Sequence, residues 1–129
     1  MLTIYTDGAC FGNPGPMGIG IAIWKDGKNI KEISEYLGEG TNNIAEYTAV
    51  FRALEEAKKL DEKDIKIKSD SQLIVNQLNG EYKTKNKMLK SLKQKIDMLR
   101  ISMHVSFQHI PREKNTVADK LSKQAIENH

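Results

Sequence analysis

Four acidic residues of this sequence stand where a carboxylate does not help the chain to fold. They are Asp7, Glu46, Asp70 and Asp119. Asp7 and Asp70 each follow a run of alternating apolar and polar residues, so we expect each at the carboxyl end of a strand. Glu46 heads an apolar helical stripe, where an unpaired acid is costly. Acids gathered in this way repel one another unless a cation lies between them. Oxygen ligands without a cysteine cluster or a histidine pair favour a hard divalent ion over zinc.

Two of these acids also have a purely structural explanation when each is taken alone. Asp70 is placed to cap a helix that begins at Ser71, and Asp119 lies three residues after Thr116, as in a capping box. The four acids together favour a metal site over separate structural roles, because Glu46 on a buried face has no such explanation.

The composition is that of one globular domain spanning residues 1–129. Hydrophobic residues make up 39% and charged residues 29%, and no run approaches the roughly 18 apolar residues of a membrane span. The N-terminus lacks the layout of a secretory signal, and Cys10 has no second cysteine with which to pair. We therefore expect a monomeric cytoplasmic protein that makes no membrane contact.

Lysines crowd one segment in the second half of the chain. They are Lys83, Lys85, Lys87, Lys90, Lys93 and Lys95. The net charge of +3 is small, but this cluster could face the phosphates of a nucleic acid. A solvated helix face explains it equally well.

Periodicity predicts the elements that position these residues. Alternating residues predict five strands, at 2–6, 19–24, 30–37, 65–69 and 101–108. Helical spacing predicts four helices, at about 42–60, 71–79, 86–100 and from 116 onward. Asp26-Gly27 predicts a hairpin turn, and the glycines and prolines of 8–16 predict a tight loop after the first strand.

This order of elements predicts an α/β fold with a mixed five-stranded sheet flanked by helices. The hairpin strands are antiparallel, and the crossover strands are parallel. The first and fourth strands would then be parallel neighbours, which brings Asp7 and Asp70 side by side. The carboxyl ends of parallel strands are where open α/β sheets place their sites.

Five blocks of the sequence carry a further signal. They are Thr6-Asp7-Gly8-Ala9-Cys10, Gly12-Asn13-Pro14-Gly15-Pro16, Thr41-Asn42-Asn43-Ile44-Ala45-Glu46, Ser69-Asp70-Ser71-Gln72 and Asn115-Thr116-Val117-Ala118-Asp119. In order and spacing, across essentially the whole chain, these blocks resemble type 1 ribonuclease H. The resemblance implies a ribonuclease H-like fold and an endonuclease that cuts the RNA strand of RNA·DNA hybrids with Mg²⁺ or Mn²⁺. It implies 5′-phosphate and 3′-hydroxyl ends, and it places the family's metal-binding, catalytic acids on the four acids named above.

The chemistry of the four acids agrees with the activity that the resemblance implies. Two hard ions about 4 Å apart could activate a water on one side of a phosphodiester and stabilise the departing 3′ oxygen on the other. Asp7 and Asp70 are placed to ligate centrally, with Glu46 and Asp119 flanking them.

The resemblance also implies which residues contact the substrate. RNA is told from DNA by its 2′-hydroxyl, which both donates and accepts hydrogen bonds, so amide side chains suit it. The contacts implied are Gly8, Cys10, Asn13, Asn42, Asn43 and Gln72, with Thr41 and Asn13 resembling contacts to DNA phosphates. The alternative for Asn42 and Asn43 is that they merely begin a helix.

The chain departs from many members of the family before its last helix. Many carry a histidine on a flexible loop there, whereas Pro111 stiffens the short connection 108–115 of this chain. His109 comes early, so we expect it to lie in the strand and to take no part in catalysis. Arg112 is closer to the last acid and is expected to touch the scissile phosphate. The chain also has no room after Gly80 for the basic insert of some members, and so resembles a compact branch found in archaea and some bacteria.

Two other functions stay open at this point. One is a nuclease or transposase domain of the same fold that acts on DNA, against which the Asn42-Asn43 pair argues. The other is a catalytically idle nucleic-acid-binding module, against which the four acids argue. The sequence does not decide whether RNA·RNA duplexes are also cut, or which metal serves.

Overall fold

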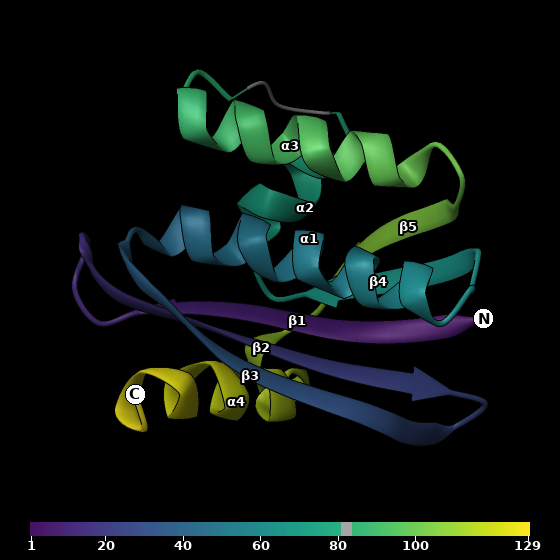
Figure 1. The fold of residues 1–129 in the computed structure, drawn as a ribbon, viewed down its shortest axis with the longest axis horizontal. Coiled ribbons are helices and arrows are strands. Elements are labelled where there is room, and N and C mark those ends of the chain that lie inside the picture. Colours follow the sequence, from purple (N-terminus) through teal and green to yellow (C-terminus); the bar gives the residue numbers. More distant parts are fainter. Residues whose placement is uncertain (81–83) are drawn as a thin grey trace.

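A five-stranded mixed sheet with helices on both sides forms the molecule (Figure 1). The structure is a computed structural model that describes residues 1–80 and 84–129. The strands are β1 (Leu2–Cys10), β2 (Gly15–Lys25), β3 (Lys28–Gly40), β4 (Asp64–Ser69) and β5 (His104–His109). The helices are α1 (Asn42–Lys59), α2 (Gln72–Leu78), α3 (Lys87–Arg100) and α4 (Thr116–Glu127), with a 3₁₀ turn η1 (Arg112–Lys114). The predicted fold class is confirmed.

The strand order β3-β2-β1-β4-β5 places the parallel pair at the centre of the sheet. β1 pairs antiparallel with β2 and parallel with β4, and the last parallel pair is Thr6 with Ser69. The two strands separate directly after this pair. Asp7, which follows Thr6 in β1, and Asp70, which directly follows β4, come next. The register of the two strands therefore places these residues side by side where the strands separate.

β1 is longer than the alternating run predicts, because its end pairs with β2. Gly8 lies opposite Ile19, and Cys10 lies opposite Met17. Asp7 therefore lies inside β1 rather than at its end, and the predicted loop 8–16 shrinks to residues 11–14. The antiparallel partner supplies ladder hydrogen bonds that outweigh the low strand propensity of the glycines.

β5 begins later than predicted, at His104. The backbone N–H of Ile101 donates to the Met98 carbonyl at 3.3 Å, so Ile101 closes the last turn of α3 and is exposed. The apolar residue that starts the buried pattern is Met103. The alternation of apolar and polar residues begins at Ile101, in the turn that ends α3. Periodicity alone does not show where the helix ends and the strand begins.

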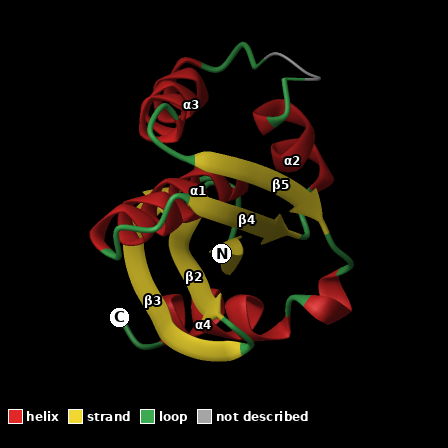
Figure 2. Cartoon of the chain, turned by 90° about the vertical axis from the view of Figure 1, so that its right-hand side faces the viewer, coloured by secondary structure: helices red, strands yellow, loops and turns green. Residues whose placement is uncertain are grey.

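Helices α1, α2 and α3 lie on one side of the sheet and α4 lies on the other (Figure 2). Buried aliphatic side chains of β1 and β2, among them Ile4 and Ile21, pack on α1, which contributes Leu54. α4 lies close against β2, where a Cβ atom on Gly20 would overlap the Ala118 carbonyl oxygen. Gly20 therefore fixes how near α4, and with it Asp119, comes to the sheet.

The lysine-rich segment forms the start of α3 and the residues before it. Lys87, Lys90 and Lys95 are exposed, and the Lys93 ammonium donates to the Asp97 carboxylate at 3.0 Å. Lys83 lies outside the described residues. Among the helices of the described part of the chain, none is long and apolar enough to cross a membrane.

Candidate active site

Three carboxylates meet where β1 and β4 separate. One oxygen atom each of Asp7, Glu46 and Asp70 lies within 4.8 Å of the others. Asp7 comes from β1, Asp70 directly follows β4, and Glu46 comes from the second turn of α1. The predicted juxtaposition of Asp7 and Asp70 is observed, and Glu46, which was expected to flank the pair, belongs to the cluster itself.

Asp119 lines the same groove from the first turn of α4. The groove has a volume of about 440 Å³ and contains all four acids. Asp119 lies outside the group of three but close enough to Asp7 to contribute to the rise in the pKa of that residue. Its Oδ2 accepts a hydrogen bond from the Lys123 ammonium at 3.2 Å. Asp119 and Lys123 therefore both line the groove.

The structural explanations for Asp70 and Asp119 do not hold. The N-cap of α2 is Ser71, whose Oγ accepts from the backbone N–H of Ile74 at 3.3 Å. The N-cap of α4 is Asn115, which makes no side-chain capping bond. Neither acid caps its helix, so capping does not explain why either carboxylate lies at the groove.

Burial and mutual repulsion govern the electrostatics of the cluster. Burial raises the pKa of Asp7 to about 7, and the neighbouring charge of Asp70 adds to this rise. Burial also raises the pKa of Glu46 well above its usual value, with the charge of Asp7 as the next cause. A cation between the three carboxylates would offset these effects, and their donor set, which is oxygen only, fits Mg²⁺ or Mn²⁺.

Two hydrogen bonds hold the carboxylates in place. The backbone N–H of Gly8 donates to Oε1 of Glu46. The hydroxyl of Ser122, on α4, shares its one proton between the Asp119 carbonyl oxygen, at 2.7 Å, and Oδ2 of Asp7, at 3.3 Å. A Cβ atom on Gly8 would overlap the backbone of Ala45 and Glu46, so only glycine permits this approach of β1 to α1.

Five of the predicted substrate contacts line the groove. They are Gly8, Cys10, Asn42, Asn43 and Arg112. The Cys10 sulfur lies 3.4 and 3.3 Å from the backbone carbonyl oxygens of Gly15 and Gly40 and shares its one proton between them.

The other three predicted contacts lie outside the lining of the groove. Thr41 is the N-cap of α1, with its Oγ1 accepting from Ile44 N–H at 3.3 Å. Asn13 Oδ1 accepts from Asn42 N–H at 3.2 Å and so ties the β1–β2 loop to the start of α1. Gln72 is exposed and donates to Asn76 Oδ1 at 2.8 Å along its own helix. Thr41 and Asn13 thus position their neighbours, whereas Gln72 points along α2.

His109 and Arg112 differ in their position relative to the groove, as the sequence predicts. His109 is the exposed last residue of β5 and does not line the groove. Arg112, the first residue of η1, does line it.

Four lining residues were not predicted from the sequence, namely Ala9, Phe11, Ser71 and Lys123. Lys123 follows Asp119 by four residues on a helix, a spacing that places two side chains on one face and could have indicated it. Phe11 is 46% exposed on the loop after β1. No pattern in the sequence distinguishes it from an ordinary loop residue.

Asn115 connects α4 to the strand that carries Asp7. Its Nδ2 donates to the Thr6 carbonyl oxygen at 2.9 Å, directly before Asp7 in β1. The residue is 1% exposed, and its Oδ1 has no hydrogen-bond partner among the described residues. This bond fixes the beginning of α4 relative to the cluster.

Comparison with known proteins places this geometry in a family. Residues 5–125 match a family model described as "Reverse transcriptase-like". The "Ribonuclease H" of Prosthecochloris aestuarii is 34% identical, over 99% of this chain and 97% of the relative. Mycobacterial relatives are 33% identical, and the chain spans 35% of their length.

Two solved structures share the fold over nearly their whole length. The crystal structure of RNase H1 from the archaeon Halobacterium salinarum superposes with a TM-score of 0.96 at 35% identity, covering 99% of this chain and 98% of that one. LC11-RNase H1, solved in complex with an RNA/DNA hybrid, superposes with a TM-score of 0.94 at 42% identity and the same coverage.

Proposed function

This chain belongs to the ribonuclease H family, and we propose that it hydrolyses the RNA strand of RNA·DNA hybrids. The observation that carries the proposal is the cluster of Asp7, Glu46 and Asp70 in an open groove. The similarity to a protein solved with an RNA/DNA hybrid supports this choice of substrate. The expected products are 5′-phosphate and 3′-hydroxyl ends.

The three clustered carboxylates are the residues that would hold a divalent cation. Their oxygens are close together and partly withdrawn from water, and they offer the hard donors that Mg²⁺ and Mn²⁺ require. Asp119 lines the same groove and would serve as a ligand for a second ion. When bound, such ions lower the pKa of water and stabilise negative charge on a phosphodiester.

The protein's own groups orient the acids and receive the substrate. Gly8 N–H and the Ser122 hydroxyl hold the Glu46 and Asp7 carboxylates in their positions. Arg112 and Lys123 supply positive charge to the same groove, where a substrate phosphate would lie.

We expect Asn42 and Asn43 to read the RNA strand. Both line the groove beside Glu46 at the start of α1. Their amides donate and accept hydrogen bonds, as recognition of a 2′-hydroxyl requires.

The test offers three labelled duplexes side by side, an RNA·DNA hybrid, an RNA·RNA duplex and a DNA duplex. Each is incubated with Mg²⁺, with Mn²⁺ or with a chelator. We expect cleavage of the RNA strand of the hybrid, only with a divalent ion. Cleavage of the DNA duplex would indicate a DNA nuclease, and binding without cleavage would indicate an idle binding module. The RNA·RNA arm decides whether that duplex is also a substrate.

The Asp70→Asn variant tests the metal assignment within this scheme. A neutral amide is a poor ligand for a hard cation, so we expect cleavage to be abolished and the heat of Mg²⁺ binding to be lost in calorimetry. Glu127→Gln removes an equal charge from an exposed residue at the end of α4 and serves as the control. Near-normal turnover of Asp70→Asn would show that the metal assignment is wrong.

A further inference from the structure

The side of the sheet that carries α4 is only partly covered. α4 packs on β1, β2 and β3 (Figure 1). On this side the register sets Tyr5 between Ala22 of β2 and Lys68 of β4. It likewise sets Thr3 between Trp24 and Lys66. We call the uncovered part the open sheet face and define it by Tyr5, Trp24, Lys66, Lys68 and Lys114.

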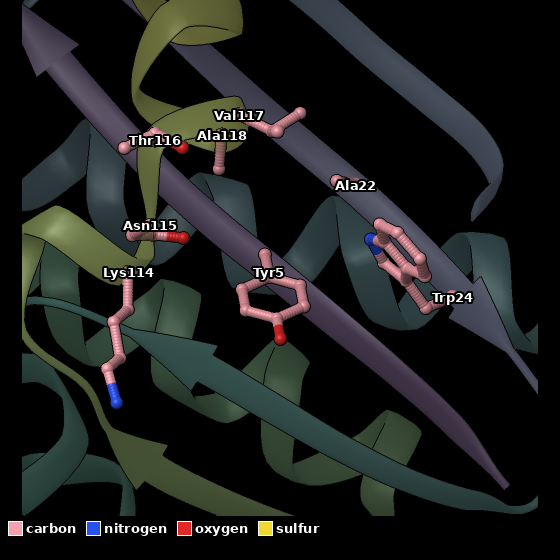
Figure 3. Close-up of a pocket in the computed structure, with 8 residues that line it drawn as sticks. All are labelled: Tyr5, Ala22, Trp24, Lys114, Asn115, Thr116, Val117 and Ala118. Atoms are coloured by element: carbon pink, nitrogen blue, oxygen red, sulfur yellow. The ribbon is translucent and has the colours of Figure 1, made fainter. Parts of the chain in front are cut away.

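Two aromatic rings form the centre of the open sheet face. Figure 3 shows Tyr5 and Trp24 projecting from β1 and β2, with Lys114 on the far side of Tyr5 and the start of α4 beyond. These residues line a pocket of about 230 Å³. A second hollow of about 230 Å³ is lined by the same two aromatic residues together with Thr3 and Lys68. The pair therefore presents its surface to two adjoining hollows.

Three lysines surround the aromatic pair. The Lys68 ammonium lies 5.4 Å from the centroid of the Tyr5 ring. Within residues 1–80 and 84–129, Lys66, Lys68 and Lys114 form no ion pair with a carboxylate. Their charges are therefore available to an anion.

Carboxylates on this side lie mainly at its two ends, and one of them, Asp26, lines the second hollow at its outer end. Asp26 stands at the β2–β3 turn and Asp64 at the start of β4, whereas Asp70 marks the opposite end at the candidate active site. The lysines lie between them. Lys68 precedes Asp70 by two residues and Lys114 follows Arg112 by two, so the face comes near the groove at the ends of β4 and of the β5–α4 connection.

We propose that the open sheet face binds single-stranded nucleic acid. Bases would stack on Tyr5 and Trp24, and the backbone phosphates would contact the three lysines. Aromatic side chains on a sheet with flanking cations are a general means of binding unpaired bases. A duplex keeps its bases stacked inside, so the natural occupant is an unpaired strand that continues from a duplex in the groove. This binding goes beyond the proposed cleavage, which requires only the groove.

Trp24 gives this proposal a local readout, because it is the only tryptophan in the sequence. Single-stranded RNA and single-stranded DNA of one sequence are titrated into the intact chain with a chelator present, and tryptophan fluorescence is recorded. We expect saturable quenching that weakens as salt is added. The RNA and DNA arms distinguish the two sources of a single strand. A polyglutamate peptide is titrated as an anion without bases, and we expect no quenching from it.

Variants of the face separate stacking from charge. Tyr5→Ala should raise the dissociation constant for the single strand roughly tenfold, because it removes one stacking surface. Tyr5 is half-buried, and so are Lys66 and Lys68. The double variant Lys66→Gln/Lys68→Gln retains part of each aliphatic stem and so guards against loss of folding. The double variant should reduce the slope of log affinity against log salt by about 1.4, since each lost phosphate contact on a single strand contributes about 0.7. Lys58→Gln, on the other side of the sheet, is the matched control.

The outcomes distinguish this proposal from the proposed function. A blunt hybrid should be cleaved by Lys66→Gln/Lys68→Gln at the wild-type rate, whether or not single strands bind. Absence of quenching by both single strands would overturn the inference while leaving cleavage untouched. Quenching by polyglutamate equal to that by the single strands would overturn it too. So would a loss of affinity in Lys58→Gln equal to that in the double variant, because binding would then depend on charge alone.

Discussion

At the scale of single residues, the site is an arrangement of carboxylates that repel one another. Asp7, Glu46 and Asp70 approach within 4.8 Å although each would be more stable farther from the others. Hydrogen bonds from Gly8 and Ser122 oppose the repulsion. A folded protein that holds like charges together without a cation loses stability for doing so, and regains it when a cation binds.

This repulsion predicts how stability depends on pH in metal-free protein. The pKa of Asp7 is about 7 in the folded chain, raised from 3.8 by burial and then by Asp70. The unfolded chain thus loses this proton first, and folding stability falls as pH rises from about 4 to about 7. We expect Asp7 to lower the free energy of unfolding by on the order of 2 to 4 kcal/mol between pH 5 and pH 8.

Urea unfolding with a chelator measures this effect in the wild type and in Asp7→Asn. The variant should lack the part of the decrease in unfolding free energy that Asp7 causes. In the wild type, Mg²⁺ should restore the free energy of unfolding at about pH 8. Glu127→Gln should follow the wild type. Parallel pH curves for the wild type and Asp7→Asn would show that the carboxyl group of Asp7 titrates normally.

A second prediction at this scale concerns the recognition of RNA by Asn43. Thr41 caps α1, so the amide of Asn43 is not needed to begin the helix. Asn43→Ala should lower hybrid cleavage by roughly tenfold or more, since a lost polar contact to a 2′-hydroxyl is worth about 1 to 3 kcal/mol. Binding of a DNA duplex, measured by anisotropy, should barely change. Equal losses for hybrid and DNA would assign Asn43 a structural role.

At the scale of elements, the position of α4 decides where the fourth acid stands. The helix lies directly on Gly18 and Gly20 of β2, and Asn115 ties its first turn to β1. Small residues on the strand therefore set the depth of the groove, as close helix packing requires.

Gly20→Ala tests this packing. The added Cβ would overlap the Ala118 carbonyl oxygen and approach Ser122 N–H at 2.7 Å, so α4 must move outward. We expect a loss of about 1 to 3 kcal/mol in the free energy of unfolding, together with weaker Mg²⁺ binding in calorimetry. Lys120→Ala, on the exposed side of α4, should change neither quantity. Unchanged stability in Gly20→Ala would mean that the contact is not close.

The short connection between β5 and α4 gives a prediction about catalysis. His109 lies outside the groove and Arg112 lines it, so Arg112→Ala should lose more activity than His109→Ala at saturating Mg²⁺. The loss in Arg112→Ala reflects a missing charge-assisted contact to phosphate. The rate profile of the wild type should lack a limb set by an imidazole near pH 6.5. A hundredfold loss in His109→Ala with a silent Arg112→Ala would reverse the two roles.

At the scale of the whole molecule, the sheet has two edges, and both are polar. The β3 edge exposes Lys28, Lys31, Glu32 and Glu39, and the β5 edge exposes His104, Ser106 and Gln108. Charged and polar side chains on edge strands disfavour pairing between molecules. The composition of the two edges therefore disfavours a sheet shared between molecules, while the groove and the open sheet face remain accessible.

We therefore expect this chain to be monomeric in solution. Light scattering coupled to size exclusion should give a mass near 14.6 kDa at every concentration tested. A mass that doubles as the concentration rises would show that one edge pairs after all.

The sequence by itself determined the class of the fold, the order of its elements and the four acids. Alternation and helical spacing report which face of each element is buried, and this information is local. The blocks around Asp7, Glu46, Asp70 and Asp119 could therefore be identified before their positions in space were known.

Only the tertiary structure decided where each element ends and what each polar side chain contacts. The continuation of β1 to Cys10 depends on pairing with β2, and the bond from Asn115 to the Thr6 carbonyl depends on where α4 packs. Lys123 became part of the groove because α4 packs on Gly20, and Tyr5 and Trp24 came to share an open face because β1 and β2 are neighbours. Such contacts join residues far apart in the chain, and no local periodicity encodes which of them will meet.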